Sequence, residues 1–208
     1  MVQVLKDEVK EALREAALDV FVAKGFASAT MAEIARAASV STGNVYRYFE
    51  GKGALLEAAV PPEVARAITR LLRERVQAYA APIEGAPGPS PHALASERLL
   101  AFTVAHRRET AFLLSRAAEG SRYEGFAAHT VELLVGLALP YVCPARPAKA
   151  GAARRAEVTR FVLTRIYENL VGTTARILAE TADEATIRAA VDAYGRYHLA
   201  GLIALAGG

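Results

Sequence analysis

The sequence predicts an all-α protein in which a small N-terminal domain precedes a larger helical one. Apolar residues recur at spacings of three and four along most of the chain, which is the period of an amphipathic helix. Runs that alternate with a period of two are rare, and Pro/Gly-rich stretches separate the helical segments. The chain has 208 residues, of which 53% are hydrophobic. This length accommodates two domains, which we place at residues 1–55 and 56–208.

The first helix is expected at roughly residues 3–24. Apolar residues with helical spacing, such as Leu13 and Phe21, form one of its faces. Gly25 follows where glycine commonly ends a helix, and Phe26 then enters as a buried anchor. This helix should provide the surface on which the following, shorter helices pack.

The next segment breaks into very short helices. Thr30 and Glu33 match a capping box, in which each side chain bonds the other's backbone N–H. After a tight turn of about four residues, Ser41 can cap a second short helix that reaches Phe49, and a third begins near Lys52. Helices of this length are unstable alone. We therefore expect a three-helix unit that contains a helix-turn-helix.

The second short helix carries the residues that suit docking in the major groove of DNA. A recognition helix enters the groove by its N-terminus, so its first turn should be small and polar. Three residues meet this requirement: Ser41, Thr42 and Gly43. Asn44 offers both a donor and an acceptor to base edges, whereas Val45 and Phe49 take the buried side of the helix.

Further residues of this segment suit phosphate binding. Tyr46, Arg47 and Tyr48 project from the same helix, and such side chains hold DNA phosphates. Lys52 and Thr30 each stand at a helix N-terminus, where free N–H groups attract anions. Net charge is only +3, and residues 1–60 hold seven Lys/Arg against eight Asp/Glu. Placement of these residues, rather than total charge, therefore favours DNA binding over a purely structural role.

Residues 29–56, with the sequence ATMAEIARAASVSTGNVYRYFEGKGALL, resemble the DNA-binding signature of the TetR (tetracycline-repressor-like) family. The resemblance extends over about residues 8–57. It implies a repressor that binds a palindromic operator as a homodimer and is released by a small molecule in the C-terminal domain. By position, it also implies DNA contacts from these residues, with Asn44 the weaker match: Thr30, Ser41, Thr42, Gly43, Asn44, Tyr46, Arg47, Tyr48 and Lys52.

Four positions depart from the pattern of the family. Ser39 stands where glycine is usual, so either Ser39 is left-handed or the turn differs. Gly53 replaces a common acidic residue, which weakens the first turn of its helix. Pro61 and Pro62 interrupt the helix expected to connect the two domains.

Beyond residue 60 the sequence predicts longer helices, at about residues 62–80, 94–106, 107–119, 122–142, 154–181 and 184–206. Pro/Gly-rich loops at 81–93 and 143–153 divide them. The last two helices carry apolar stripes: Val158, Val162, Ile166, Leu170, Thr173 and Ile177 on one, and Ile187, Val191, Tyr194, His198, Leu202 and Leu205 on the other. Such stripes fit either an intramolecular core or a four-helix dimer interface. The family resemblance favours the dimer.

An effector pocket is expected among helices 94–181, lined by apolar side chains and a few polar groups. The aliphatic and aromatic bias favours a lipophilic effector. The candidate effector-binding residues are Phe102, His106, Phe112, Phe126, His129, Arg165, Asn169 and Thr173.

Other function classes find little support. The four His residues have no metal-ligand spacing, no cofactor motif or catalytic motif is present, and we expect no enzyme activity. The charged N-terminus does not fit a signal peptide, and no apolar run is long enough to span a membrane, so we expect a cytoplasmic protein. Two alternatives stay open: a regulator without an effector, and an all-α enzyme or lipid-binding module that does not bind DNA.

Overall fold

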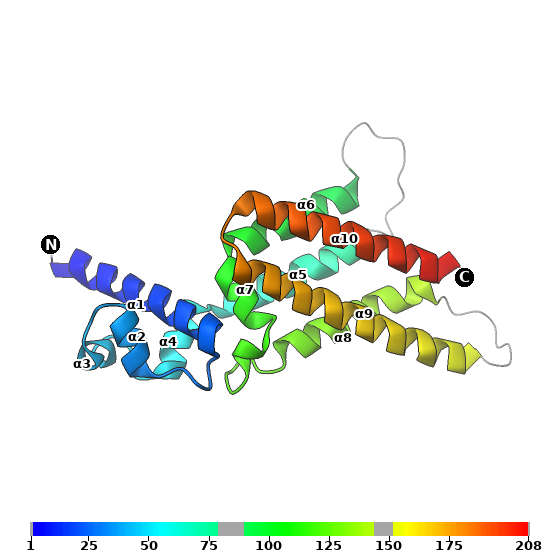
Figure 1. Ribbon diagram of the computed structural model, residues 1–208. Helices are drawn as coiled ribbons and strands as arrows, with labels where there is room; N and C mark the ends of the chain where they lie inside the picture. The colour runs from blue at the N-terminus through cyan, green and yellow to red at the C-terminus, as the bar shows by residue number, and fades with distance from the viewer. Residues whose placement is uncertain (1, 79–89, 144–151, 208) are drawn as a thin grey trace.

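The computed structural model describes residues 2–78, 90–143 and 152–207, and every regular element in these ranges is a helix. Four helices form one end of an elongated molecule (Figure 1): α1 (Val2–Lys24), α2 (Met31–Ala37), α3 (Thr42–Tyr46) and α4 (Lys52–Ala59). The remaining elements form a bundle: α5 (Pro62–Gln77), α6 (Pro91–Ala105), α7 (Arg107–Leu113), the 3₁₀ helix η2 (Arg116–Ala118), α8 (Phe126–Val142), α9 (Ala152–Glu180) and α10 (Glu184–Gly207). The all-α prediction is confirmed. None of the described helices is long and apolar enough to cross a membrane.

The short N-terminal helices pack on α1 around one apolar cluster, as predicted. Phe21 is fully buried, and its ring lies 5.4 Å from that of Phe26, centroid to centroid. Ile34, Val45 and Leu55 supply fully buried side chains from the next three helices. Each such side chain contributes about 1.5–3 kcal/mol on burial. This tertiary packing is what keeps helices of five to eight residues folded.

The turn between α2 and α3 places Ser39 in the left-handed region, with φ 56°. Among the described residues it is the one non-glycine with positive φ. The Val40 N–H donates to Ala35 O over 2.9 Å, which closes the turn. The chain therefore keeps the backbone path that glycine normally serves, at a cost of about 1–2 kcal/mol for the Cβ atom.

Some predicted helix ends were displaced. The helix expected at 107–119 ends at Leu113, because Ser115 is extended and its hydroxyl instead caps η2. The helix expected at 122–142 begins only at Phe126, after Gly125 with φ 80°. The recognition helix ends at Tyr46 and continues as a turn to Phe49. The predicted loops at 81–93 and 143–153 lie largely outside the described residues.

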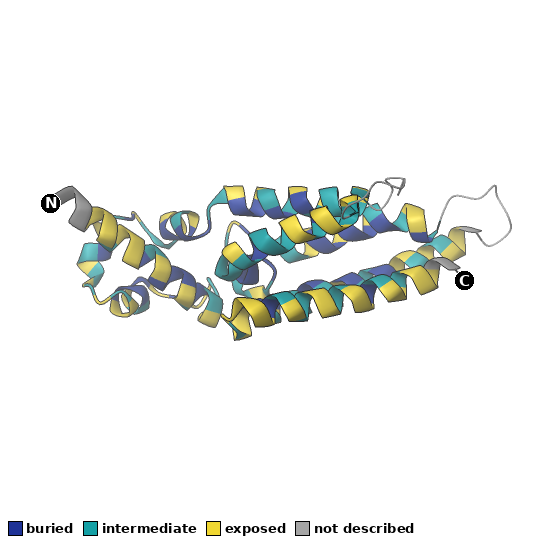
Figure 2. Ribbon diagram, turned by 90° about the horizontal axis from the view of Figure 1, so that it is seen from above, coloured by how far each residue is buried: buried dark blue, intermediate teal, exposed yellow. Residues whose placement is uncertain are grey.

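In the bundle, α9 lies against α7, α8 and α10, and α5 lies against α6 and α8. A second apolar cluster centres on Val135 of α8 and Leu163 of α9, both fully buried. Figure 2 shows buried residues on the faces that the helices turn toward one another and exposed residues on their outer faces. The bundle thus has a core separate from that of α1–α4.

The two ends of the molecule join mainly through α7 and η2. The Phe26 N–H donates to Ala117 O over 2.8 Å. Arg108 of α7 pairs with Asp19 of α1 over 2.7 Å and also with Glu15. Phe112 of α7 is buried in the N-terminal cluster. That cluster runs across the predicted boundary between residues 55 and 56, so the boundary itself stays a prediction.

The proline pair starts a new helix at this junction. Pro61 is the N-cap of α5 and Pro62 opens it, a position that proline tolerates well. The preceding carbonyl, that of Val60, accepts a 2.6 Å hydrogen bond from the Tyr123 hydroxyl. The chain between the two ends is therefore divided into α4 and α5, and the Tyr123 hydroxyl holds the junction between them in place.

Candidate nucleic-acid interface and cavity

The start of α2 is fixed by reciprocal capping. The Glu33 N–H donates to Thr30 Oγ1 over 3.2 Å, and the Thr30 N–H donates to Glu33 Oε2 over 3.1 Å. Glu33 also pairs with Lys24 at the end of α1. The hydrogen bond from Lys24, followed by those from Thr30, lowers the pKa of Glu33 from its ordinary 4.5 to about 2. The predicted capping box is confirmed, and it ties α2 to α1.

The first turn of α3 is capped and open to solvent. The Asn44 N–H donates to the Ser41 hydroxyl over 3.2 Å. Thr42 and Asn44 are half-buried, and Gly43 is exposed. A Cβ atom on Gly43 would meet nothing within 4 Å in the described structure. Packing within the chain therefore gives no reason for glycine here, whereas a close external approach does.

The rest of α3 divides between core and surface. Val45 and Phe49 are buried, as predicted. Tyr46 is 55% exposed and Arg47 is exposed, and neither side chain forms a hydrogen bond or ion pair within the described ranges. Tyr48 is half-buried and packs on the N-terminal cluster. Of the predicted outward side chains, Tyr46 and Arg47 are thus the freest to contact another molecule.

Lys52 has a different environment from the one that the sequence suggests. Its ammonium donates to Phe26 O over 2.6 Å, to Ala29 O over 2.9 Å and to Ala27 O over 3.2 Å. The same Nζ lies 4.6 Å from the centroid of the Phe26 ring. An ammonium has three donors, and all three are used. Lys52 therefore braces the α1–α2 loop, and a phosphate contact would have to displace one of these bonds.

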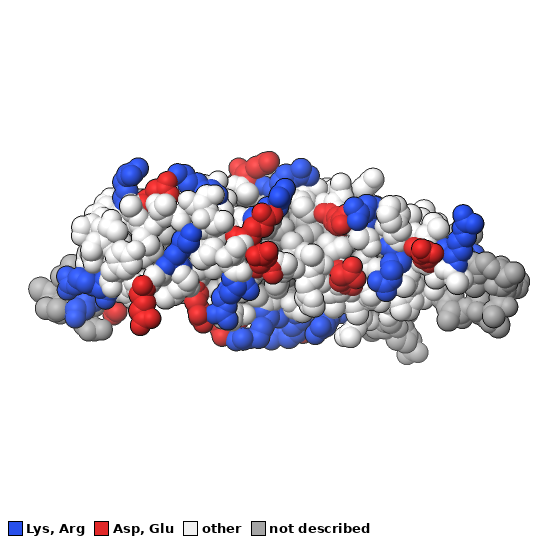
Figure 3. Space-filling view, turned by 90° about the horizontal axis from the view of Figure 1, so that it is seen from below, with Lys and Arg blue, Asp and Glu red and all other residues white. Residues whose placement is uncertain are grey.

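On the face of the molecule seen from below (Figure 3), charges of both signs are interspersed. Figure 3 shows Lys and Arg alternating with Asp and Glu along the lower face, without a continuous basic stripe. This agrees with the net charge of +3. Any DNA contact therefore depends on individually placed groups such as Arg47 rather than on a broad positive field.

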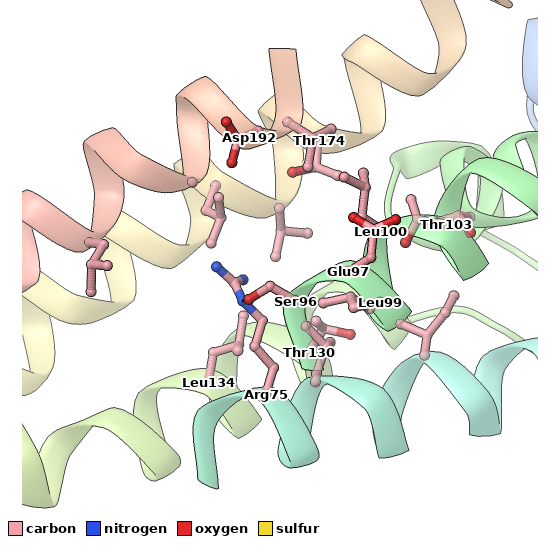
Figure 4. Close-up of a pocket in the computed structure, with 18 of the residues that line it drawn as sticks. Arg75, Ser96, Glu97, Leu99, Leu100, Thr103, Thr130, Leu134, Thr174 and Asp192 are labelled. Atoms are coloured by element: carbon pink, nitrogen blue, oxygen red, sulfur yellow. The ribbon is translucent and has the colours of Figure 1, made fainter. Parts of the chain in front are cut away.

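The bundle contains a cavity of about 380 Å³. Helices α5 to α10 all contribute to it, and Leu is the most frequent residue of its lining. Polar residues also line it (Figure 4): Arg75, His92, Ser96, Glu97, Thr103, Thr110, Thr130, Thr174, Asp192 and Arg196. Its size falls in the range usual for small-molecule sites.

None of the predicted effector-binding residues lines this cavity, so their role stays a prediction: Phe102, His106, Phe112, Phe126, His129, Arg165, Asn169 and Thr173. Phe112 is fully buried in the N-terminal cluster. His129 and Arg165 are exposed, and Asn169 accepts a hydrogen bond from the Tyr194 hydroxyl. The predicted residues and the cavity lining share helices but occupy different faces of them. On α9, for example, Thr174 faces the cavity.

Three threonines that line the cavity are buried: Thr103, Thr110 and Thr130. Thr103 and Thr130 lie in largely apolar helices, which is a signal that the sequence itself contains. The Thr110 hydroxyl has no hydrogen-bond partner among the described residues. Because buried polar groups are normally paired, Thr110 is a candidate ligand contact.

The last two helices present apolar side chains to solvent, and of the predicted stripes only Val158 and Leu205 are among them. Ile187 and His198 are buried within the chain. The exposed set is Val158, Phe161, Tyr197 and Ile203, with Leu205 at 39% the most exposed of the predicted α10 stripe. Phe161 and Ile203 are each 64% exposed.

Comparison with known proteins finds relatives of the N-terminal region. Residues 13–59 match the family described as bacterial regulatory proteins, tetR family. The HTH-type transcriptional regulator SrpR of Pseudomonas putida is 44% identical over 54 residues, or 26% of this chain and 25% of SrpR. The uncharacterized HTH-type transcriptional regulator TtgW, also of Pseudomonas putida, is 45% identical over 53 residues, or 26% of this chain and 40% of TtgW. Both matches thus span less than half of each relative.

A solved structure is similar over most of the chain. It comes from Mesorhizobium loti and is proposed to be a TetR-family transcriptional regulator. The match covers 93% of this chain and 96% of that one, with a TM-score of 0.39 and 17% sequence identity.

Proposed function

Because this chain belongs to the TetR family of bacterial regulatory proteins, we propose that it binds a specific DNA site through α3 and regulates transcription there. The observation that carries the proposal is the exposed surface of α3, where Tyr46 and Arg47 stand free beside the open backbone of Gly43. The caps at Thr30 and Ser41 and the brace at Lys52 support this surface, since they fix the helix that presents it.

The residues of α3 divide into candidate base contacts and candidate phosphate contacts. Thr42, Asn44 and Arg47 can reach base edges, where Asn pairs well with adenine and Arg with guanine. Ser41, Tyr46 and Tyr48 can donate hydroxyl protons to phosphates. Phosphate contacts would set the register of α3 in the groove, and the base contacts would select the sequence.

The protein acts as a homodimer through α9 and α10 in this proposal. The exposed apolar residues of these helices would be buried against the same residues of a second copy. Two copies related by a twofold axis would place two α3 helices in successive major grooves, which corresponds to a palindromic operator.

A small lipophilic effector in the bundle cavity would release the DNA, so the regulator would be a repressor. Helix α7 connects the cavity to α1, because its Thr110 lines the cavity and its Arg108 pairs with Asp19 of α1. A shift of α7 on ligand binding would therefore move α1, and with it the helices packed on α1.

The test is binding of the full chain to sites enriched from a random DNA library, measured by mobility shift. Arg47→Ala should weaken binding to an enriched site by about 10- to 100-fold, as expected for loss of a base contact worth about 1–3 kcal/mol, and should leave the thermal midpoint unchanged. Arg73→Ala removes an exposed Arg from the outer side of α5 and should bind as the wild type does. Failure to enrich any sequence, or wild-type affinity of the Arg47 variant, would refute the proposal.

A further inference from the structure

Among the described residues that line it, the bundle cavity has one cation without an anionic partner. The Arg75 Nε donates to the Ser96 hydroxyl over 3.1 Å, and no carboxylate in the described ranges pairs with Arg75. Figure 4 shows the Arg75 side chain rising from α5 between the surrounding helices, with its guanidinium beside Ser96. A half-buried guanidinium that bonds only to a neutral hydroxyl keeps its full charge available.

The carboxylates of the cavity already have partners of their own. Glu97 pairs with Arg188 over 2.7 Å. Asp192 pairs with Arg196 over 3.0 Å. Both carboxylates of the described lining are therefore paired with an Arg other than Arg75.

The charge of Arg75 affects the pKa values of two neighbouring histidines. Burial first, and then the positive charge of Arg75, lowers the pKa of both His92 and His198. Both imidazoles thus favour the neutral form beside Arg75. A negative group in the cavity would be attracted to the guanidinium without competition from a protein carboxylate.

A second residue of the lining also has an unpaired polar group. Thr110 is 1% exposed, it lines the cavity, and its hydroxyl has no partner among the described residues. Leaving such a group unpaired is unfavourable. Ile68 and Arg75 both line the cavity from α5, and seven residues of helix span about 10 Å. The cavity is therefore long enough for an extended ligand.

We propose that this cavity binds a lipophilic carboxylate. The carboxylate pairs with the Arg75 guanidinium, and the apolar body lies along Leu72, Leu100 and Leu134 toward Thr110. A neutral lipophile lacks the anion that Arg75 requires, and a cationic one is repelled. The binding of a carboxylate is argued from the cavity alone. The role of that carboxylate as the effector that releases DNA rests on the proposed function.

The test is calorimetric titration of the full chain, without DNA, with three probes of equal chain length below their micellar concentrations: decanoate, decanol and decylamine. Decanoate should bind at least about tenfold more tightly than decanol, as expected for one charge-assisted pair of about 1.5 kcal/mol, and decylamine should bind most weakly. Equal affinities of wild-type protein for decanoate and decanol would overturn the proposal. A naphthoate and the matching naphthol show whether the preferred acid is aliphatic or aromatic.

Variants place the selectivity at Arg75. Arg75→Gln should remove the preference for decanoate over decanol, and Arg73→Gln on the same helix should keep it. A tenfold preference that survives in Arg75→Gln would overturn the assignment. If Arg75→Gln does not fold, Arg75→Lys retains a cation without the planar fork and should keep a reduced preference, whereas an undiminished one would count against pairing with Arg75.

DNA binding is then measured with and without decanoate. Decanoate binding without release of DNA would leave the carboxylate site intact and refute only the effector role. Specific DNA binding by a protein that shows no preference for decanoate would refute the carboxylate site and leave the DNA-binding proposal standing.

Discussion

The two ends of this molecule use polar side chains in opposite ways. In α1–α4, polar side chains bond to backbone groups: Ser41 accepts from the Asn44 N–H, and Lys52 donates to three carbonyls. In the bundle, polar side chains line a cavity. The two buried side-chain atoms without a partner in the described ranges, Thr110 Oγ1 and His198 Nε2, both belong to the bundle.

The difference indicates what each end is built for. A surface that must match DNA benefits from a fixed backbone, and side-chain caps provide this where helices have only five to eight residues. A cavity for a ligand benefits from groups that are unsatisfied until the ligand binds. Such groups reduce the stability of the free protein. Polar-to-apolar substitutions should therefore have opposite effects at the two ends.

The largest expected effect is at Lys52. Lys52→Met keeps a long flexible side chain but removes the donors to the α1–α2 loop, so the free energy of unfolding should fall by about 2 kcal/mol. Urea denaturation measures this loss. Lys6→Met, at an exposed site on α1, should change it little. Weakened DNA binding with unchanged stability would instead mean that Lys52 acts mainly as a phosphate ligand.

A smaller effect of opposite sign is expected at Thr110. Thr110→Val keeps the shape of the side chain and removes an unpaired buried hydroxyl, so the free energy of unfolding should rise by about 1 kcal/mol. Thr130→Val is the matched control, since the Thr130 hydroxyl donates to Phe126 O over 2.9 Å. This control should not gain stability. Differential scanning calorimetry measures both variants. Stabilisation of Thr130→Val without stabilisation of Thr110→Val would contradict the proposed difference between the two ends of the molecule.

The smallest effect concerns the capping box and depends on pH. Because the pKa of Glu33 is about 2 in the folded protein and ordinarily 4.5, its carboxylate stabilises the fold fully above pH 4.5. That contribution is lost as the pH falls from 4.5 toward 2. The stability difference between wild type and Glu33→Gln should therefore shrink over this interval in thermal unfolding. A difference independent of pH would show that the carboxylate charge contributes nothing.

Sequence patterns predicted the N-terminal end well because its signals are local. The capping box at Thr30 and the cap at Ser41 each act within three residues, and Val45 and Phe49 reveal the buried side of α3 by their spacing. The hydrogen bonds of Lys52 could not be predicted from local patterns, because its partners lie 23 to 26 residues away in the sequence. A lysine at a helix start looks the same in sequence whether it binds phosphate or a carbonyl.

By itself, the sequence determined the helices of this protein, the small core under α3 and the polar surface of α3, because helix period and capping depend on neighbours along the chain. Only the tertiary structure decided which faces of α5–α10 enclose a cavity and which apolar residues of α9 and α10 remain exposed. Those outcomes depend on how helices distant in sequence pack side by side. The role of Arg75 also depends on the packed bundle, in which no described carboxylate pairs with it.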